Sequence, residues 1–202
     1  EIPDTVTEIE TAAFSGTPWL EDRSQDVLIV GDGILLAYRG EGTAYEIPDT
    51  GHSIGDSAFA NCTVLESVTI PDSVMYIREG AFDNCIALKE IAFPEQSNMI
   101  ISADALRNTL WFQEQPDGCV VIGSTLYRFK GSGTQAQVPE GVTVIGESAF
   151  EHTAVTSVIL PDGVQEIRRA AFYGCENLRS ITLPQGVRKI GTMGFYHCGS
   201  LT

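Results

Sequence analysis

The chain has 202 residues, of which 43% are hydrophobic and 19% are charged, so it can bury a core and is not a disordered chain. Acidic residues outnumber basic ones by 27 to 12, and residues 1–60 hold 12 acids against two bases, Arg23 and Arg39. This excess argues against binding to nucleic acid or to anionic membrane surfaces. No apolar run approaches the roughly 20 residues of a membrane-spanning helix, so we expect no membrane insertion.

A repeat with a period of about 23 residues runs along the chain. The dipeptide Ala-Phe occurs five times, and each Phe lies 12 residues after the apolar residue of an apolar-Pro pair. These phenylalanines are Phe14, Phe59, Phe82, Phe150 and Phe172. We count seven copies, of which the fourth is degenerate and the fifth is shorter by a single residue; they start at Ile2, Ile47, Ile70, Phe93, Val138, Leu160 and Leu183.

Each copy contains two patterns that favour short strands. Leu-x-x-Ile-x-Ile, as in Leu65–Ile70, alternates apolar and other residues, and the proline after it stops the strand. Val-x-x-Ile predicts a second short strand, and Ala-Phe-x-x-Cys-x-x-Leu has the spacing of a helical turn. Because one such unit cannot bury its own apolar face, the copies should stack into a solenoid with a parallel sheet and with the phenylalanines buried in register.

This pattern resembles the BspA-type leucine-rich repeat over nearly the whole chain. The resemblance implies a mainly β, right-handed leucine-rich-repeat solenoid with short helical turns and about seven coils. It also implies an extracellular or cell-surface location in bacteria, because members of the family are generally surface or secreted proteins, and some bind host matrix proteins or other cells. We expect one domain over residues 1–202. Since the chain starts and stops within the repeat, we expect a piece of a longer array.

Two insertions interrupt the array at about residues 19–43 and 111–134. Each begins at a tryptophan, Trp19 or Trp111, and continues as two apolar runs around a turn that contains glycine. This is a hairpin signal, so we expect hairpins near residues 27–38 and 119–129. Each tryptophan should fill the junction between coil and hairpin. The glycine pairs fit hairpin turns better than a phosphate loop, because no strand-glycine-helix fingerprint follows them.

Four of the five cysteines occupy one position, three residues after the Phe: Cys62, Cys85, Cys175 and Cys198. A buried ladder of small apolar thiols is the favoured interpretation. Disulfides between the neighbours Cys62 and Cys85, or Cys175 and Cys198, are a geometrically possible alternative. We expect no metal site, because Cys-x-x-Cys is absent. His52, His152 and His197 occupy variable positions and form no catalytic set, so we expect neither an enzyme nor a cofactor.

The repeat predicts a binding face on the outside of the Leu-x-x-Ile-x-Ile sheet. Outward residues alternate with the buried ones, and most are small and hydroxylated: Ser67, Thr69, Glu90, Ala92, Ser157, Ile159, Ser180 and Thr182. We expect a monomeric, non-enzymatic adhesion module whose partner is a host extracellular-matrix or cell-surface protein or a glycan. A rigid spacer that carries another domain is the alternative. A second location for the site is the acidic hairpin edge at Glu21, Asp22, Asp26 and Asp32. Tyr76, Tyr173 and Tyr196 are candidates for exposed aromatic residues.

Overall fold

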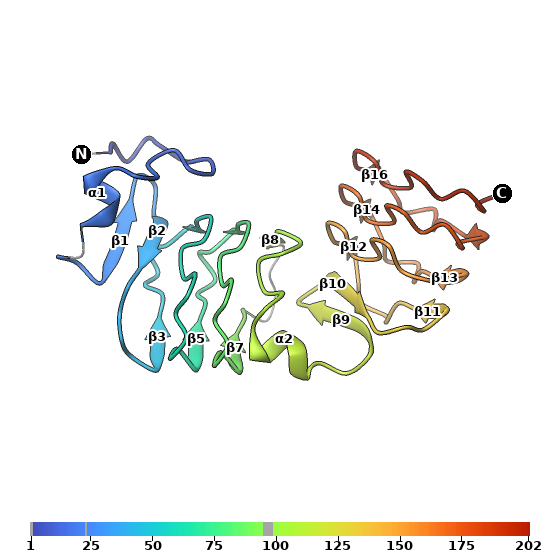
Figure 1. Ribbon diagram of the computed structural model, residues 1–202. Helices are drawn as coiled ribbons and strands as arrows, with labels where there is room; N and C mark the ends of the chain where they lie inside the picture. The colour runs from blue at the N-terminus through green and yellow to red at the C-terminus, as the bar shows by residue number, and fades with distance from the viewer. Residues whose placement is uncertain (1, 23, 95–98) are drawn as a thin grey trace. The chain divides into compact units, whose positions relative to one another are not determined.

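The computed structural model describes residues 2–22, 24–94 and 99–202. The chain divides into two compact units, residues 1–114 and residues 115–202, and each is a stack of short coils (Figure 1). Four coils lie in the first unit and three in the second, so the predicted solenoid of about seven coils is confirmed. That the two units form a single continuous domain stays a prediction.

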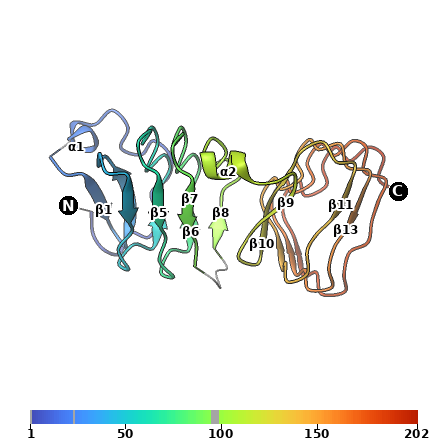
Figure 2. The same cartoon turned by 90° about the horizontal axis from the view of Figure 1, so that it is seen from below.

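The coils of the first unit contribute strands to two sheets (Figures 1 and 2). The three-stranded sheet is parallel and consists of β3 (Ala44–Glu46), β5 (Ser67–Thr69) and β7 (Glu90–Ala92). The five-stranded sheet has the order β1-β2-β4-β6-β8, and its strands are β1 (Val27–Val30), β2 (Ile34–Tyr38), β4 (Ser53–Ile54), β6 (Tyr76–Ile77) and β8 (Ile100–Ile101). Among the described strands of this sheet, only β1 and β2 pair antiparallel, as the predicted hairpin.

The second unit repeats this arrangement. Its parallel three-stranded sheet consists of β11 (Gln135–Gln137), β13 (Ser157–Ile159) and β15 (Ser180–Ile181). Its five-stranded sheet consists of β9 (Gly118–Ile122), β10 (Thr125–Lys130), β12 (Val144–Ile145), β14 (Glu166–Ile167) and β16 (Lys189–Ile190). The strands β9 and β10 form the second hairpin, also as predicted. We expected the Leu-x-x-Ile-x-Ile segments to form one parallel sheet. Among the described strands they form two separate sheets, because the second hairpin insertion lies between β7 and β11 in the chain.

A ladder of phenylalanine rings forms the core of each unit. The rings of Phe59 and Phe82 stack with centroids 4.8 Å apart, and those of Phe150 and Phe172 with centroids 4.9 Å apart. All four side chains are fully buried, which confirms the prediction for these positions. The stack continues onto a hairpin residue in each unit, Tyr38 in the first and Phe129 in the second. The hairpins therefore extend the aromatic core as well as the five-stranded sheets.

The Ala-Phe segments, for which the spacing predicts a helical turn, are tight turns with backbone hydrogen bonds between residues three apart. The N–H of Cys62 donates to the carbonyl of Phe59, and the N–H of Leu65 donates to that of Cys62, so each bond spans three residues. Positive φ angles two residues before and after the Phe, such as 56° at Ser57 and 66° at Asn61, keep these bonds from continuing as a helix.

The two short helices start where the chain leaves the repeat. They are α1 (Pro18–Glu21) and α2 (Leu110–Glu114). Thr17 and Thr109 lie at the position that holds cysteine in the regular coils, and their hydroxyls accept from the N–H groups of Leu20 and Phe112. Threonine at this position satisfies an otherwise unpaired donor of the first helical turn. Thr153, at the same position of the fifth coil, donates its hydroxyl to the carbonyl of Phe150 and no helix follows, so the threonine supports the helix without by itself starting it.

Candidate partner-binding face

In the first unit, the predicted outward residues lie side by side on the three-stranded sheet. Register pairing places Ala44, Ser67 and Glu90 in one row across β3, β5 and β7. A second row consists of Glu46, Thr69 and Ala92. All six side chains are exposed except that of Ser67, which is half-buried. Between the rows, Val68 and Ile91 are buried and Tyr45 is half-buried, so the alternation predicted from the sequence is present.

The second unit presents an equivalent face. Gln135, Ser157 and Ser180 form one row, and Gln137 pairs with Ile159 in the other. Thr182 lies one residue beyond the end of β15 and is exposed. Ile159 is 63% exposed, an unusual fraction for a large apolar side chain in a strand.

Sequence reasoning missed the first strand of each sheet, which contributes Ala44, Glu46, Gln135 and Gln137. These strands follow a hairpin and lack the leucine that opens the other copies. The signal was nevertheless present, because Tyr45 and Ala136 stand two residues before the Ile and Val of the next apolar-Pro pair, where other copies have the inward residue.

The two faces differ in charge. In the first unit, Glu46 and Glu90 are exposed, and a shallow groove of about 500 Å³ runs beside the second row, lined by Glu46, Asp49, Thr69, Asp72 and Ser73 among others. In the second unit, the outward positions of the three strands hold only uncharged residues. The first face suits a partner with cationic or hydrogen-bond donor groups, and the second suits an uncharged polar partner.

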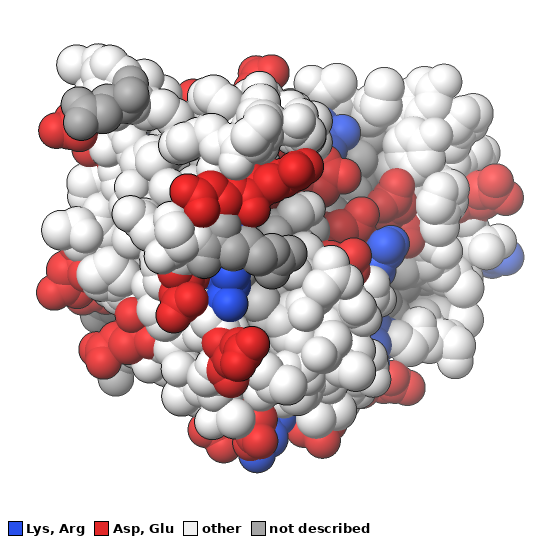
Figure 3. Space-filling model, turned by 60° about the vertical axis from the view of Figure 1, so that its left-hand side comes forward, with Lys and Arg blue, Asp and Glu red and all other residues white. Residues whose placement is uncertain are grey.

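The acidic hairpin edge is the other location expected from the sequence. Glu21, Asp22, Asp26 and Asp32 are all exposed, and Asp32 approaches His52 at 3.2 Å. The hydrogen bonds from Ser24 to Asp22 lower the pKa of this carboxyl. On the face shown in Figure 3, Asp and Glu side chains make up most of the charged surface.

The cysteine ladder is largely internal. Cys85 and Cys175 are fully buried, whereas Cys62 and Cys198 are half-buried, and all five cysteines are free thiols. Burial raises the pKa of Cys119, Cys175 and Cys198. The pKa of Cys85 is also raised, first by its hydrogen bond with the Cys62 thiol and then by burial, and the same hydrogen bond lowers the pKa of Cys62.

The aromatic candidates divide into exposed and half-buried residues. Tyr76 and Tyr196 are 42% and 50% exposed, as expected, but Tyr173 is half-buried. Trp111 is half-buried against Phe93, with ring centroids 5.4 Å apart, which agrees with a junction role. Trp19 is 42% exposed although it packs edge-on against Phe14, so it does not fill its junction completely.

Over the described residues, no group of three or more His, Cys, Asp or Glu side chains is arranged to hold a metal ion. In the same part of the chain, none of the helices is long and apolar enough to span a bilayer.

Stacked coils that repeat the same sequence unit, with a parallel strand in each coil and a phenylalanine ladder inside, define a leucine-rich-repeat solenoid. The family described as BspA type leucine rich repeat region, with six copies, matches residues 38–115 and 120–202. The chain therefore belongs to the BspA-type leucine-rich repeat family.

Several solved bacterial structures are similar to this chain. A leucine-rich repeat protein of Treponema pallidum is 29% identical, with a TM-score of 0.49 and 87% of each chain covered. A leucine-rich cell surface protein of Faecalibacterium prausnitzii is 26% identical, with a TM-score of 0.40, and the match covers 90% of this chain and 52% of that one. A leucine-rich repeat protein of Eubacterium ventriosum is 24% identical, with a TM-score of 0.42, and the match covers 82% of this chain and 46% of that one. The chain thus spans about half the length of the last two proteins. No curated protein matches it.

Proposed function

We propose that this chain is a non-enzymatic binding module of a bacterial surface or secreted protein. It would present the outer faces of its three-stranded sheets to a host matrix protein, a cell-surface protein or a glycan. The observation that carries the proposal is the in-register arrangement of exposed or half-buried, mostly polar side chains, such as the half-buried Ser67 beside the exposed Glu90 and the half-buried Ser157 beside the exposed Ser180. Membership of the BspA-type family supports a location at or outside the cell surface.

The chemistry of the faces favours weak contacts that are repeated. Serine, threonine and glutamine side chains let a peptide backbone or a sugar ring approach closely and exchange hydrogen bonds with it. The described outward positions of both three-stranded sheets hold no aromatic side chain of the kind that dominates tight interfaces. Affinity would then depend on several copies acting together.

The rigid spacer is a second candidate function. In the second unit, the rings of Phe129, Phe150, Phe172 and Phe195 stack in one series with centroids 4.9 to 5.2 Å apart. A continuous aromatic stack joins each coil to the next and supports a stiff rod. The two candidates differ in that a spacer needs no ligand on its outer face.

The test is a binding screen of the purified chain against matrix proteins, mucins and glycans, followed by charge insertion in the face. Ser67→Lys with Thr69→Lys covers the first unit, and Ser180→Lys with Thr182→Lys covers the second. We expect at least one pair to lower affinity by about tenfold or more, because a lysine blocks close approach and its charge must be desolvated.

Thr63→Lys and Asn177→Lys are the matched controls, because both residues are exposed in turns outside the strands. Combined in one variant, they add two positive charges, as each face pair does, and should leave binding unchanged. If both face variants bind as tightly as the unmodified chain, the site lies elsewhere, and the hairpin edge around Asp26 and Asp32 is the next location to test. A chain that binds nothing in the screen favours the spacer.

A further inference from the structure

The cysteine ladder of the first unit holds two thiols that take no part in the proposed binding face. Cys62 and Cys85 stand at the same position of the second and third coils, one repeat apart. The backbones of these coils are joined at the turn that carries the cysteines, because the N–H of Asn61 donates to the carbonyl of Asp83 at 2.9 Å. The two cysteines are therefore direct neighbours across the coils.

The spacing of the second and third coils fits a disulfide. Phe59 and Phe82 precede the two cysteines by three residues, and their stacked rings have centroids 4.8 Å apart. This distance measures the separation of equivalent positions in the two coils. The Cα atoms of a disulfide lie about 4.4–6.8 Å apart. Equivalent residues of these coils are thus within reach of a bridge when their side chains point toward each other.

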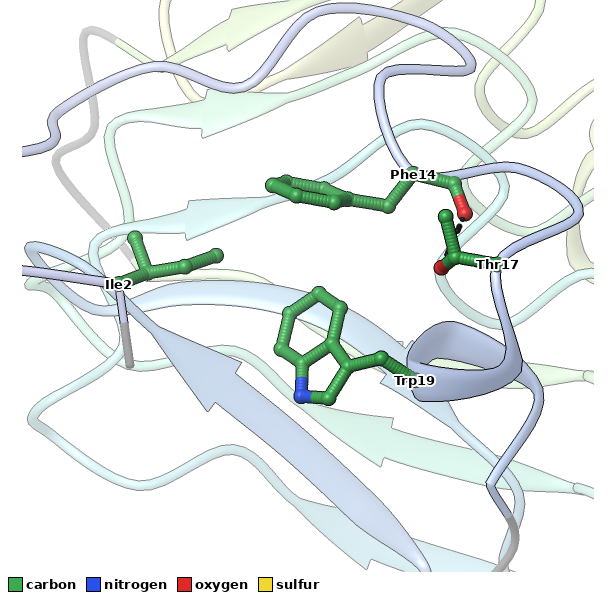
Figure 4. A pocket seen from close by; sticks show the side chains of 4 residues that line it. All are labelled: Ile2, Phe14, Thr17 and Trp19. Atoms are coloured by element: carbon green, nitrogen blue, oxygen red, sulfur yellow. Dashed lines mark hydrogen bonds between the residues drawn. The ribbon is translucent and has the colours of Figure 1, made fainter.

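Threonine and cysteine point in different directions at the ladder position. The hydroxyl of Thr17 donates to the carbonyl of Phe14 in its own coil (Figure 4), and the hydroxyl of Thr153 bonds within its own coil in the same way. The Sγ atom of Cys85 instead donates to the carbonyl of Phe59 in the preceding coil at 3.0 Å. A cysteine at this position therefore reaches toward the ladder residue of the coil before it.

The second unit shows how close two ladder side chains come. Thr153 occupies the ladder position in the coil that follows the second hairpin, and Cys175 occupies it in the next coil. The Oγ1 atom of Thr153 and the Sγ atom of Cys175 lie 3.5 Å apart. The equivalent residues after the first hairpin are Cys62 and Cys85, and their two thiols share a hydrogen bond.

The two sulfur atoms differ in exposure and in reactivity. Cys62 is half-buried, and its Sγ lies 3.7 Å from the carbonyl of the hairpin residue Tyr38. Cys85 is fully buried. The hydrogen bond between the thiols lowers the pKa of Cys62 and, together with burial, raises the pKa of Cys85. Because the thiolate is the nucleophilic form of cysteine, a small oxidant should react first at Cys62, with the shielded thiol of Cys85 beside it.

The neighbouring cysteines of the second unit are bonded differently. The Sγ atoms of Cys175 and Cys198 each donate to a phenylalanine carbonyl of the preceding coil, at 3.0 and 3.1 Å, and burial raises the pKa of both thiols. Within the part of the chain that the structure describes, no two cysteines other than Cys62 and Cys85 share a thiol–thiol hydrogen bond. A nucleophilic thiol and a second thiol in contact with it thus occur together in the first unit.

We propose that Cys62 and Cys85 form a redox modification site that reacts with hydrogen peroxide and closes to a disulfide between the second and third coils. In the first step, the sulfur of Cys62 attacks one peroxide oxygen and the O–O bond breaks. The sulfur is oxidised to a sulfenic acid, and the other oxygen leaves as water with the proton of the Cys62 thiol. In the second step, the sulfur of Cys85 attacks the sulfenic sulfur, the S–O bond breaks, and the hydroxyl leaves as water with the Cys85 proton.

The bridge joins the coils that end in β5 and β7. A cross-link restricts the unfolded chain more than the folded one, so the oxidised protein should unfold at a higher urea concentration than the reduced protein. A thiol reductant such as dithiothreitol should reverse the modification by disulfide exchange. A lower urea midpoint after oxidation would show that the bridge does not fit the native coils, and would overturn the proposal.

Treatment of the reduced 202-residue chain with hydrogen peroxide tests the site without any binding partner, so the outcome is independent of the proposed function. The remaining thiols are alkylated in urea, and trypsin then cuts after Arg39, Arg78 and Lys89, which places the two cysteines on separate peptides. We expect two of the five thiols to be lost, these two peptides to be joined by a disulfide, and dithiothreitol to restore both thiols. Five free thiols after oxidation, or another pairing, would overturn the proposal.

Two serine variants separate the steps. In Cys85→Ser, the sulfenic acid on Cys62 has no thiol partner, so it should persist and be trapped by dimedone, whereas the unmodified chain should give little adduct. In Cys62→Ser, Cys85 should remain a thiol because it is fully buried. Circular dichroism checks that both variants fold. No dimedone adduct in the first variant, or oxidation of Cys85 in the second, would contradict the assigned order.

Transfer of the site to the second unit is the decisive experiment. Thr153→Cys places a thiol where the Thr153 hydroxyl contacts Cys175, so peroxide should close a second disulfide from the new thiol to Cys175. Thr153→Ser is the matched control and should leave Cys175 reduced. Cys198 should also stay reduced at the peroxide exposure that closes the first bridge. A Thr153→Cys chain without the second bridge, or a bridge between Cys175 and Cys198 that forms as fast as the first one, would overturn the proposal.

Discussion

The Sγ atom of Cys85 donates a hydrogen bond to the carbonyl oxygen of Phe59, 26 residues earlier, at 3.0 Å. The same bond joins Cys175 to Phe150 at 3.0 Å and Cys198 to Phe172 at 3.1 Å. Each cysteine thus links its own coil to the preceding one. The repeated cysteine therefore has a role beyond filling space in the core.

Replacing Cys85 by alanine should therefore destabilise the first unit. The change removes a buried sulfur and a hydrogen bond between coils, and we expect a loss of about 1–2 kcal/mol in the free energy of unfolding, measured with urea. Cys62→Ala is the control, because Cys62 is half-buried and its Sγ lies 3.7 Å from the carbonyl of Tyr38. Equal losses for the two variants would contradict the role given to the short bond.

The thiols should react in a definite order. The lowered pKa and partial exposure of Cys62 make it the most reactive in the native protein, while Cys85 and Cys175 should react only after unfolding. Alkylation for increasing times, followed by peptide mass spectrometry, gives the order. Labelling of Cys85 as fast as that of Cys62 would show that the ladder is open to solvent.

Stability should fall at alkaline pH. The pKa of Cys85 and that of Cys175 are raised in the folded chain, whereas an unfolded cysteine has a pKa of about 8.5. Below that pH both states keep the thiol protons, and above it only the unfolded chain loses them. The free energy of unfolding should therefore decrease by up to about 1.4 kcal/mol per pH unit for each buried thiol.

Urea unfolding between pH 7 and pH 10 measures this slope. The double variant Cys85→Ala with Cys175→Ala lacks both thiols and should show a flatter profile over the same range. A slope that is unchanged in the double variant would assign the alkaline loss to other groups, such as Tyr38, whose pKa is raised by burial.

The position two residues before each repeat phenylalanine allows a reciprocal pair of substitutions that tests the cost of its backbone conformation. Ala170 has a φ of +55° in the second unit, and Gly80 has a φ of +60° at the same repeat position in the first. Ala170→Gly should stabilise its unit, and Gly80→Ala should destabilise its unit, by about 1 kcal/mol each, because the left-handed conformation costs alanine but not glycine. A Cβ on Gly80 would meet no atom closer than 3.4 Å, so conformation and not collision sets the cost.

Thermal or urea unfolding of the two variants gives the sign of each effect. Opposite signs of similar size would confirm the conformational argument. Destabilisation by both changes would instead point to loss of helpful contacts of the Ala170 methyl group, which is 6% exposed.

The sequence by itself determined the solenoid, the number of coils, the burial of phenylalanines such as Phe82, and the two hairpins. These features follow from a pattern that recurs many times, so each copy supports the same assignment. The outward direction of Ser67 and Thr69 was equally predictable, because strand alternation is a local property.

Only the tertiary structure showed that the hairpin strands β2 and β10 head the five-stranded sheets, and that β3 and β11 complete the three-stranded ones. It alone also showed that cysteine bonds to the preceding coil, and that Trp19 is exposed where Trp111 is half-buried. These outcomes depend on which coil lies next to a given residue, at least one whole repeat away in the chain, and neighbours across coils do not follow from the local pattern of one copy. Burial at the first and last coils is likewise set by the presence or absence of a neighbour, which the repeating residues cannot encode because they are alike in every coil.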